Sequence, residues 1–293
     1  MDKSISENLA VGDIVTFGSY PQDLVTDKSV VKEIDKLCRK WSSWKKFDYL
    51  LGKGRFADCE IQGKRYRSTV VTIRKRMSRL LYEGFDYKDR KKYSFEYKPI
   101  EWQVLSINDG KALLVTKKGI DTHEFFVGKF KRNIDGKTIY QNNYKHSAIR
   151  QWLNSTFYDM AFSDEEKSII ELTQVKNDAS TTKKNVNEYA CEDTLDRVFL
   201  LSFQEAKTLF ADNKARRKKA TEYTKAQGCF VYRTEDEKYN NSLWWLRSPD
   251  SNYCDIVRCV GYGGGMSDGG FSIAQEPADD LISVAPVIVV RLK

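Results

Sequence analysis

Hydrophobic positions recur with a period of two over several short segments of this chain, the spacing of strands that bury one face. In residues 100–106, Ile100, Trp102 and Val104 alternate with other residues, before an Asn108-Asp109-Gly110 turn and the apolar run 112–115. This pattern predicts a β-hairpin, and Gln62-Gly63 predicts a second one within residues 57–73. The other predicted strands cover residues 11–20, ended by Pro21, and residues 198–201, 242–247 and 282–292.

Apolar residues at three- and four-residue intervals predict helices over residues 29–41, 74–85, 147–161, 202–210 and 220–227. The stripe of the first helix consists of Val30, Val31, Ile34, Leu37, Cys38 and Trp41. Ser147 is a predicted N-cap. Two capping boxes, Ser163-x-x-Glu166 and Ser202-x-x-Glu205, predict where helices begin, because the serine oxygen and the glutamate carboxylate each accept a hydrogen bond from a free N–H group.

The last fifty residues follow neither period. Residues 248–275 are rich in Ser, Asp, Asn, Gly and Tyr and lie between two predicted strands. No internal repeat or linker divides the chain. We therefore expect one α+β domain over residues 1–293, with helical and hairpin elaborations in its N-terminal third, at residues 24–98. Residues 242–293 would form a C-terminal ligand-display segment and the closing strands.

Composition narrows the class of protein. The 293 residues are 41% apolar and 13% aromatic, which is enough to fill a core and excludes a mainly disordered chain. No window approaches the about 18 apolar residues of a membrane span, and the first nine residues lack the features of a secretory signal, so we expect a cytoplasmic protein. The net charge is +8, but acidic residues lie between the basic clusters. The clusters therefore indicate a solvated surface, and no nucleic-acid partner is expected.

The chain carries no familiar signature of catalysis or of zinc binding. Its six cysteines include no C-x-x-C pair, and His123 and His146 are its two histidines, so neither a disulfide scaffold nor a zinc site is predicted. The G-x-S-x-G, P-loop and H-E-x-x-H motifs are absent. We expect no catalytic residue, no bound metal and no cofactor.

Six segments together resemble an uncharacterised bacterial family, the DUF6273-type domains. They are Phe17–Gln22 (FGSYPQ), Gln62–Arg67 (QGKRYR), Pro99–Leu105 (PIEWQVL), Ile149–Asn154 (IRQWLN), Phe199–Ser202 (FLLS) and Trp244–Pro249 (WWLRSP). The tail also resembles C-type-lectin-like folds, including formylglycine-generating-enzyme-like domains. The resemblance implies a variable segment displayed between core strands. Related domains usually close with Val-Arg-Pro-Ala, where this chain has Val284-Ala285-Pro286-Val287 and no arginine.

Residues 251–272 resemble the variable region of proteins diversified by retroelements, in which changes at adenines of Asn-type codons generate many residue types. The Tyr, Ser, Gly and Asn of this segment are also typical of binding loops, where aromatic rings supply contact area and small polar residues adapt their hydrogen bonds. We expect a non-catalytic recognition protein whose ligand is a protein or another macromolecule, within a complex. The expected contact residues are Ser251, Asn252, Tyr253, Asp255, Tyr262, Met266, Asp268 and Phe271.

Two alternatives remain open. Cys254 and Cys259 resemble the copper-binding cysteine pair of formylglycine-generating enzymes, and two thiolates suit the soft Cu(I) ion. Strand alternation argues against this pair, because residues five apart face opposite sides unless a bulge intervenes. Glu276-Pro277-Ala278, followed by Asp279 and Asp280, resembles the Glu-Pro-Asn motif of calcium-dependent sugar binders, but Ala278 removes one oxygen ligand.

Overall fold

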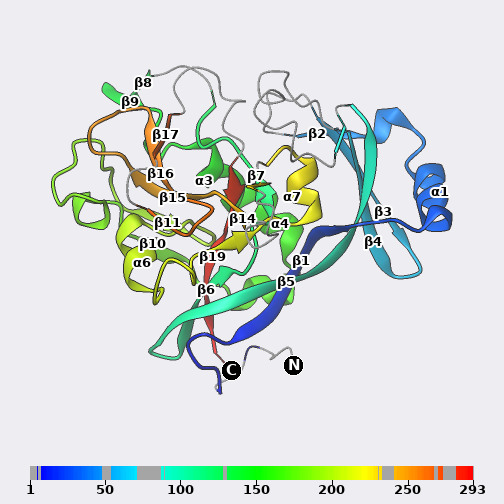
Figure 1. The fold of residues 1–293 in the computed structure, drawn as a ribbon, viewed down its shortest axis with the longest axis horizontal. Coiled ribbons are helices and arrows are strands. Elements are labelled where there is room, and N and C mark those ends of the chain that lie inside the picture. The colour runs from blue at the N-terminus through cyan, green and yellow to red at the C-terminus, as the bar shows by residue number, and fades with distance from the viewer. Residues whose placement is uncertain are drawn as a thin grey trace.

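A computed structural model of the chain describes residues 5, 8–47, 54–70, 87–88, 90–127, 131–229, 231–232, 241–266, 270–272 and 282–292 (Figure 1). The helix predicted over residues 74–85 lies outside these residues. The described part is a mixed α and β structure with mostly antiparallel sheets. None of its helices is long and apolar enough to cross a membrane.

The larger sheet has seven strands in the order β19-β6-β5-β4-β3-β2, with β1 paired to β5, and every pairing is antiparallel. The strands are β1 (Ile14–Leu24), β2 (Lys45–Lys46), β3 (Arg55–Ile61), β4 (Lys64–Val70), β5 (Lys92–Asn108), β6 (Lys111–Thr116) and β19 (Val287–Arg291). At 17 residues, β5 pairs with β1, β4 and β6. It therefore joins the N-terminal arm, formed by helix α1 (Lys28–Leu37) and β2–β4, to the rest of the molecule (Figure 1).

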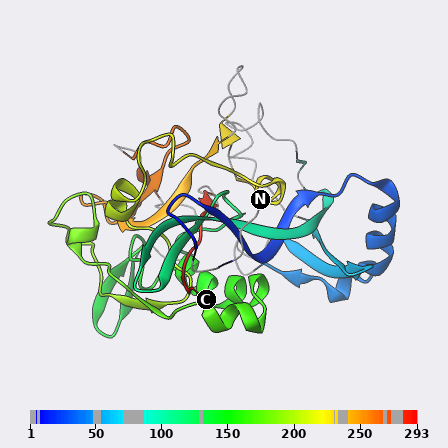
Figure 2. The same cartoon turned by 90° about the horizontal axis from the view of Figure 1, so that it is seen from below.

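The second sheet has five strands in the order β17-β16-β15-β18-β7. They are β7 (Asp121–Thr122), β15 (Trp244–Pro249), β16 (Ile256–Val260), β17 (Gly270–Ser272) and β18 (Ser283–Val284). Only Ala285 and Pro286 separate β18 from β19, so the closing segment contributes a strand to each sheet. Figures 1 and 2 show this second sheet and the N-terminal arm at opposite ends of the molecule.

Shorter elements complete the described structure. The small sheets comprise β8 (Lys131–Ile134) with β9 (Lys137–Tyr140), β10 (Thr173–Val175) with β11 (Thr194–Asp196), and β12 (Lys218–Lys219) and β13 (Val231–Tyr232) with β14 (Asn241–Ser242). The remaining helices are α3 (Ala148–Trp152), a π-helical turn (Leu153–Phe157), α4 (Tyr158–Ala161), α5 (Asp164–Ile169), α6 (Phe203–Thr208), α7 (Glu222–Ala226) and two 3-10 turns (Trp41–Ser43 and Ala179–Thr181).

Most of the locally coded predictions are confirmed. Both hairpins form, and both of their two-residue turns have the positive φ angles of type I′ turns: 50° and 76° at Gln62-Gly63, and 50° and 70° at Asp109-Gly110. The Ser163 and Ser202 capping boxes are present in full, and Ser147 caps α3. These signals succeed because each cap and each turn involves residues within four positions of one another along the chain.

The prediction that Pro21 ends the first strand is wrong. The strand β1 continues to Leu24, and Pro21 pairs with Tyr97 of β5, between two register shifts. Within the described residues β1 pairs with β5 alone, so it is an edge strand. A proline is compatible with that position, because an edge strand does not need every backbone N–H group for pairing.

Three other boundaries also differ from the predictions. Helix α1 ends at Leu37, so Leu37 and Trp41, which are 54% and 53% exposed, do not join its buried face. Residues 198–201 form no regular strand; Phe199 makes a single bridge to Val287. The strand predicted over residues 282–292 is divided at Ala285-Pro286, where the chain passes from one sheet to the other.

The tryptophans of β15 anchor the second sheet in the core. Trp244 and Trp245 are both fully buried, on opposite faces of the strand. The Trp245 Nε1 donates to the His123 carbonyl oxygen at 2.9 Å, and the Trp244 Nε1 donates to the Arg216 carbonyl oxygen at 3.0 Å. Both faces of β15 are therefore covered, and the C-terminal segment starts from a rigid strand.

Candidate functional site

The predicted contact residues divide into two groups. Ser251, Asn252, Tyr253 and Asp255 precede β16, whereas Tyr262 and Met266 follow it. Residues 248–275 were expected to be irregular, yet β16 is a largely buried strand paired with β15 on one side and β17 on the other. Five residues at about 3.3 Å each span roughly 16 Å. The two groups thus lie near opposite ends of β16.

The first group forms a firmly held turn, residues 251–255, which we call the display turn. Asn142 fixes its backbone: Nδ2 donates to the Tyr253 carbonyl oxygen at 2.9 Å, and the backbone N–H donates to the Cys254 carbonyl oxygen at 3.3 Å. The Asn252 N–H donates to Asp250 at 2.7 Å, and the Lys184 ammonium donates to the Asn252 side chain at 3.0 Å. The Tyr253 side chain stays 58% exposed.

An ion pair beneath the display turn stabilises its base. The Arg258 guanidinium contacts the Asp250 carboxylate, and both side chains are at least nine-tenths buried. The Asp250 N–H also donates to the Ile256 carbonyl oxygen at 2.9 Å. Arg258 therefore contributes a neutralised charge inside the protein, and no cation of β16 faces the solvent there.

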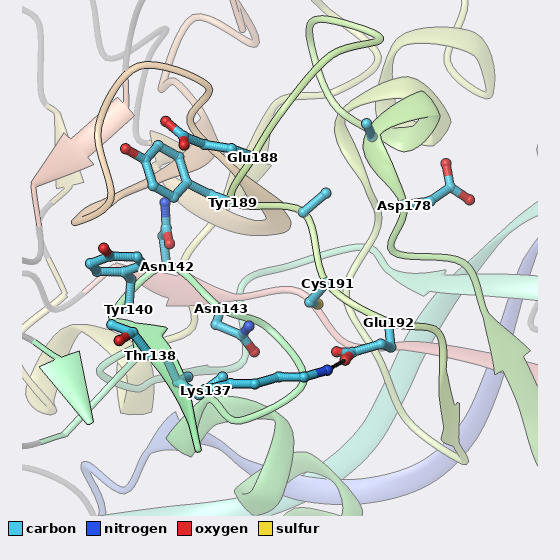
Figure 3. Close-up of a pocket in the computed structure, with 13 residues that line it drawn as sticks. Lys137, Thr138, Tyr140, Asn142, Asn143, Asp178, Glu188, Tyr189, Cys191 and Glu192 are labelled. Carbon is cyan, nitrogen blue, oxygen red and sulfur yellow. Dashed lines mark hydrogen bonds and ion pairs between the residues drawn. The ribbon is translucent and has the colours of Figure 1, made fainter. Parts of the chain in front are cut away.

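Beside the display turn lies a cavity of about 430 Å³, which we call the tyrosine pocket (Figure 3). Tyr140 from β9 and Tyr189 from the loop before β11 meet edge to face, with ring centroids 5.7 Å apart and an interplanar angle of 86°. Asn142 lies below the Tyr189 ring, and a Lys137–Glu192 ion pair of 3.3 Å lies at the far end of the pocket. The lining thus combines aromatic faces with amide and charged groups, as ligand pockets do.

Electrostatic effects link the tyrosine pocket to the display turn. Burial raises the pKa of the Tyr189 hydroxyl, and the neighbouring Glu188 raises it further. Burial also raises the pKa of the Cys254 thiol, with further increases from the charges of Asp255 and Glu188. Glu188 therefore acts on both parts, and near neutral pH the Cys254 sulfur is held as a thiol.

The second group surrounds a glycine turn at the other end of β16. The Arg216 Nε donates to the Gly264 carbonyl oxygen at 2.9 Å, and the Arg217 Nε donates to the Gly263 carbonyl oxygen at 3.1 Å. Gly264 has a φ of 82°, and a Cβ there would lie 1.6 Å from the Asn213 oxygen, so only glycine fits. Tyr262 is 40% exposed, but Met266 is buried in the main hydrophobic core.

The other predicted groups are only partly described. Asp268 lies outside the described residues, as do Glu276, Asp279 and Asp280 of the calcium motif. Phe271 is described as a member of β17, paired with Val257. Cys259 lies on β16 and is buried, whereas Cys254 is half-buried in the display turn. Among the described residues no three His, Cys, Asp or Glu side chains form a cluster that could hold a metal, and the two-cysteine copper site stays a prediction.

Sequence reasoning missed the tyrosine pocket. Its two aromatic residues lie 49 positions apart in the chain, so no local period reveals the pair. The composition does carry a signal: the segments around Tyr140 (TIYQNNY) and Tyr189 (NVNEYAC) contain Tyr and Asn, as the C-terminal segment does.

A further cavity, of about 440 Å³, lies where the N-terminal arm meets the rest of the chain. Its innermost polar groups bond to one another. Arg67, which is 1% exposed, makes a two-pronged contact with Asp58 at 2.8 and 2.7 Å, and the Tyr20 hydroxyl donates to Asp121 at 2.6 Å. The Arg67–Asp58 contact joins β4 to β3 within the arm, and the Tyr20–Asp121 bond joins β1 to β7. These polar groups are already paired, so the tyrosine pocket and the display turn remain the better candidate site.

A family model described as a domain of unknown function, DUF6273, matches residues 109–287. The chain belongs to this family. No curated protein and no solved structure matches the chain. The tyrosine pocket, the display turn and the glycine turn all lie within the residues that match the DUF6273 model, whereas β1 to β5 lie before them. The candidate site is therefore part of the family domain, and the N-terminal arm precedes it.

Proposed function

We propose that this DUF6273 protein is a non-catalytic binding protein, and that the tyrosine pocket and the display turn together recognise a segment of a partner protein. The observation that carries the proposal is the exposed Tyr253 ring on a turn whose backbone is tied by Asn142 to the wall of a pocket lined by Tyr140 and Tyr189. Rigid aromatic anchors on a tethered turn bind at little entropic cost.

The pocket favours a basic or aromatic residue of the partner. Glu188 is exposed next to the two tyrosine rings, and a cation near both a carboxylate and an aromatic face gains from each contact. Tyr262 and the glycine turn lie at the far end of β16 and take no part in this surface. The proposal rests on a C-type-lectin-like scaffold that presents loops from core strands, as the resemblance implies.

Short phage-displayed peptides, selected on the intact protein, test this function. We expect selection of peptides rich in Lys, Arg or aromatic residues, with binding weakened at least about tenfold in Tyr189→Ala and Tyr253→Ala. Tyr262→Ala is the matched control, because it removes an exposed tyrosine of the same segment and should bind as the unaltered protein does. Failure to select any peptide, or equal binding by all three variants, would contradict the proposal.

Retroelement diversification of residues 251–272 is a separate part of the proposal. Its support is the composition of the display turn, which is the exposed part of this stretch. In β16, by contrast, Val257 and Cys259 are buried and Arg258 is ion-paired within the protein. Sequencing the locus tests it: a near-repeat of this coding segment beside a reverse transcriptase is expected. If neither is present, the surface has a fixed specificity.

A further inference from the structure

A basic cavity of about 460 Å³ is lined in part by residues 145–147, which follow the 137–143 segment of the tyrosine pocket along the chain. Its charged or titratable lining residues are Arg132 on β8, Lys145 and His146 in the loop before α3, and Arg150 on α3, and no acidic residue lines it. Its other lining residues include Ser147, Asn154 and Ser155, whose side chains donate to backbone carbonyl oxygens. Basic side chains thus border a space large enough for a small molecule.

Two of the cations around this cavity are neutralised from outside it. Arg150 forms a 2.7 Å ion pair with the fully buried Asp196, and Lys145 lies 3.7 Å from Glu192, which lines the tyrosine pocket. Neither acid is among the residues that line the cavity, so the lining itself carries no negative charge.

Arg132 differs from these two, because no carboxylate lies within ion-pair distance of it in the described part of the chain. Its Nη2 donates to the His146 carbonyl oxygen at 2.7 Å, and its guanidinium lies 4.1 Å from the centroid of the Phe126 ring. Its Nε is buried and has no acceptor. A guanidinium presents five N–H donors, and in the half-buried Arg132 the Nε has lost water that no acceptor replaces.

His146 lies among the same cations. Burial lowers the pKa of its imidazole, and the charges of Lys145, Arg132 and Arg150 lower it further, against a small opposing effect of Glu192. A neutral histidine among cations is the environment that an anion would change most.

We propose that this cavity binds a tetrahedral oxyanion, the phosphate group of a small soluble phosphate ester, with Arg132 as its main ligand. Arginine pairs with phosphate through two parallel N–H donors, and the ammonium group of Lys145 is a further cation of the lining. The site requires neither the tyrosine pocket nor the proposed peptide partner.

Proton NMR of the histidines on the intact protein tests the site, with inorganic phosphate as the probe and chloride at equal ionic strength as the reference. His123 and His146 are the two histidines of the chain, so His146→Gln assigns the signals. Phosphate should shift the His146 resonance to saturation and raise its pKa by about one unit. The absence of a saturable shift would overturn the proposal.

Arg132→Gln should weaken phosphate binding at least about tenfold. The matched control is Arg197→Gln, because Arg197 also donates to a carbonyl oxygen, that of Ile170, and lies 5.9 Å from a ring centroid, that of Tyr158, but does not line the cavity. If Arg132→Gln does not fold, Lys145→Gln replaces it, since Lys145 is 37% exposed. Equal loss in the control, or none in the cavity variants, would overturn the assignment.

The source of the phosphate is decided by two further probes. Glycerol phosphate should bind at least as tightly as inorganic phosphate, whereas phosphatidylcholine vesicles containing phosphatidic acid should bind no better than vesicles without it. Binding confined to the phosphatidic acid vesicles would overturn the small-ligand proposal and point to a lipid surface.

Discussion

Arg247 and Arg132 place a guanidinium in two different environments, one buried and one half-buried. Arg247 is 2% exposed and is surrounded by acceptors: Glu205 Oε1 at 2.7 Å, Asn177 Oδ1 at 3.1 Å and the carbonyl oxygens of Lys176 and Leu200 at 2.9 and 2.6 Å. Arg132 has one carbonyl oxygen and one ring. The hydrogen-bond donors of Arg247 have acceptors within the protein, whereas the Nε of Arg132 has none.

Lys218 is a buried cation in a third kind of environment. Lys218 is 2% exposed, donates to the Thr116 carbonyl oxygen, and lies 5.3 Å from the centroid of the Trp244 ring. Burial lowers its pKa to about 7. Where Arg247 keeps its charge by pairing with Glu205, Lys218 can reduce the cost of burial by releasing a proton.

The largest expected effect is that of Arg247→Ala. It removes the link between β15, α6 and the 176–177 loop and leaves Glu205 partly buried without its cation, so the free energy of unfolding should fall by about 3–5 kcal/mol. Urea denaturation measures the loss. Arg291→Ala, which breaks a more exposed pair with Glu171, should cost less than about 1 kcal/mol. If both variants lost the same free energy of unfolding, buried and exposed ion pairs would not differ in the way proposed.

Acid should weaken the Arg247 region in a defined pH window. Burial raises the pKa of Glu205, but the charge of Arg247 and hydrogen bonds from Arg247 and Ser202 outweigh it, so the net pKa is below 4.5. Because the folded pKa is the lower one, this stabilisation is present above pH 4.5 and is lost as the pH falls through the folded value. Glu205→Gln should cost about 2 kcal/mol at pH 7 and progressively less below pH 4.5 in urea denaturation.

Lys218→Met should stabilise the protein by about 1 kcal/mol at pH 7, because it removes a buried charge that has no carboxylate partner among the described residues. The sign of the pH dependence is the same as for Glu205, because both groups have a folded pKa below the unfolded one. Between pH 7 and 10.5 the unfolded chain carries a proton on Lys218 that the folded protein lacks, so the stability of the unaltered protein rises with pH. The advantage of Lys218→Met should shrink over this window, and a constant advantage would contradict a lowered pKa.

The smallest expected effect is that of Arg132→Gln on stability. We expect a change within about 0.5 kcal/mol in phosphate-free buffer, since the arginine lacks a carboxylate to lose. Added phosphate should raise the melting temperature of the unaltered protein and not that of the variant. If Arg132→Gln lowered the free energy of unfolding as much as Arg247→Ala, Arg132 would have a structural role as well.

Local signals in the sequence predicted the hairpins at Gln62-Gly63 and Asp109-Gly110 and the capping boxes at Ser163 and Ser202, because the interacting groups are near neighbours. The course of β1 through Pro21 could not be predicted in that way, since it depends on pairing with Tyr97. The order of strands in the two sheets is likewise set by contacts between distant segments.

The candidate site was predictable in part. Sequence composition identified Tyr253, which the structure places on the exposed display turn, but it also grouped Met266 with the exposed residues, although that side chain packs in the core. The pairing of Tyr140 with Tyr189 and the missing carboxylate beside Arg132 are properties of the folded chain alone. A binding site built from several loops has no characteristic spacing of residues in the sequence from which it could be predicted.

The pairing of β18 and β19 affects how the chain folds during its synthesis. Residues 283–291 pair with β7 and with β6, about 170 positions earlier, so neither sheet is complete until the ribosome has delivered the last strand. During synthesis β6 presents an unpaired edge, and such edges invite aggregation. Folding dominated by such distant pairing is slow. The nascent chain should therefore depend on chaperones that shield this edge until β19 has been synthesised.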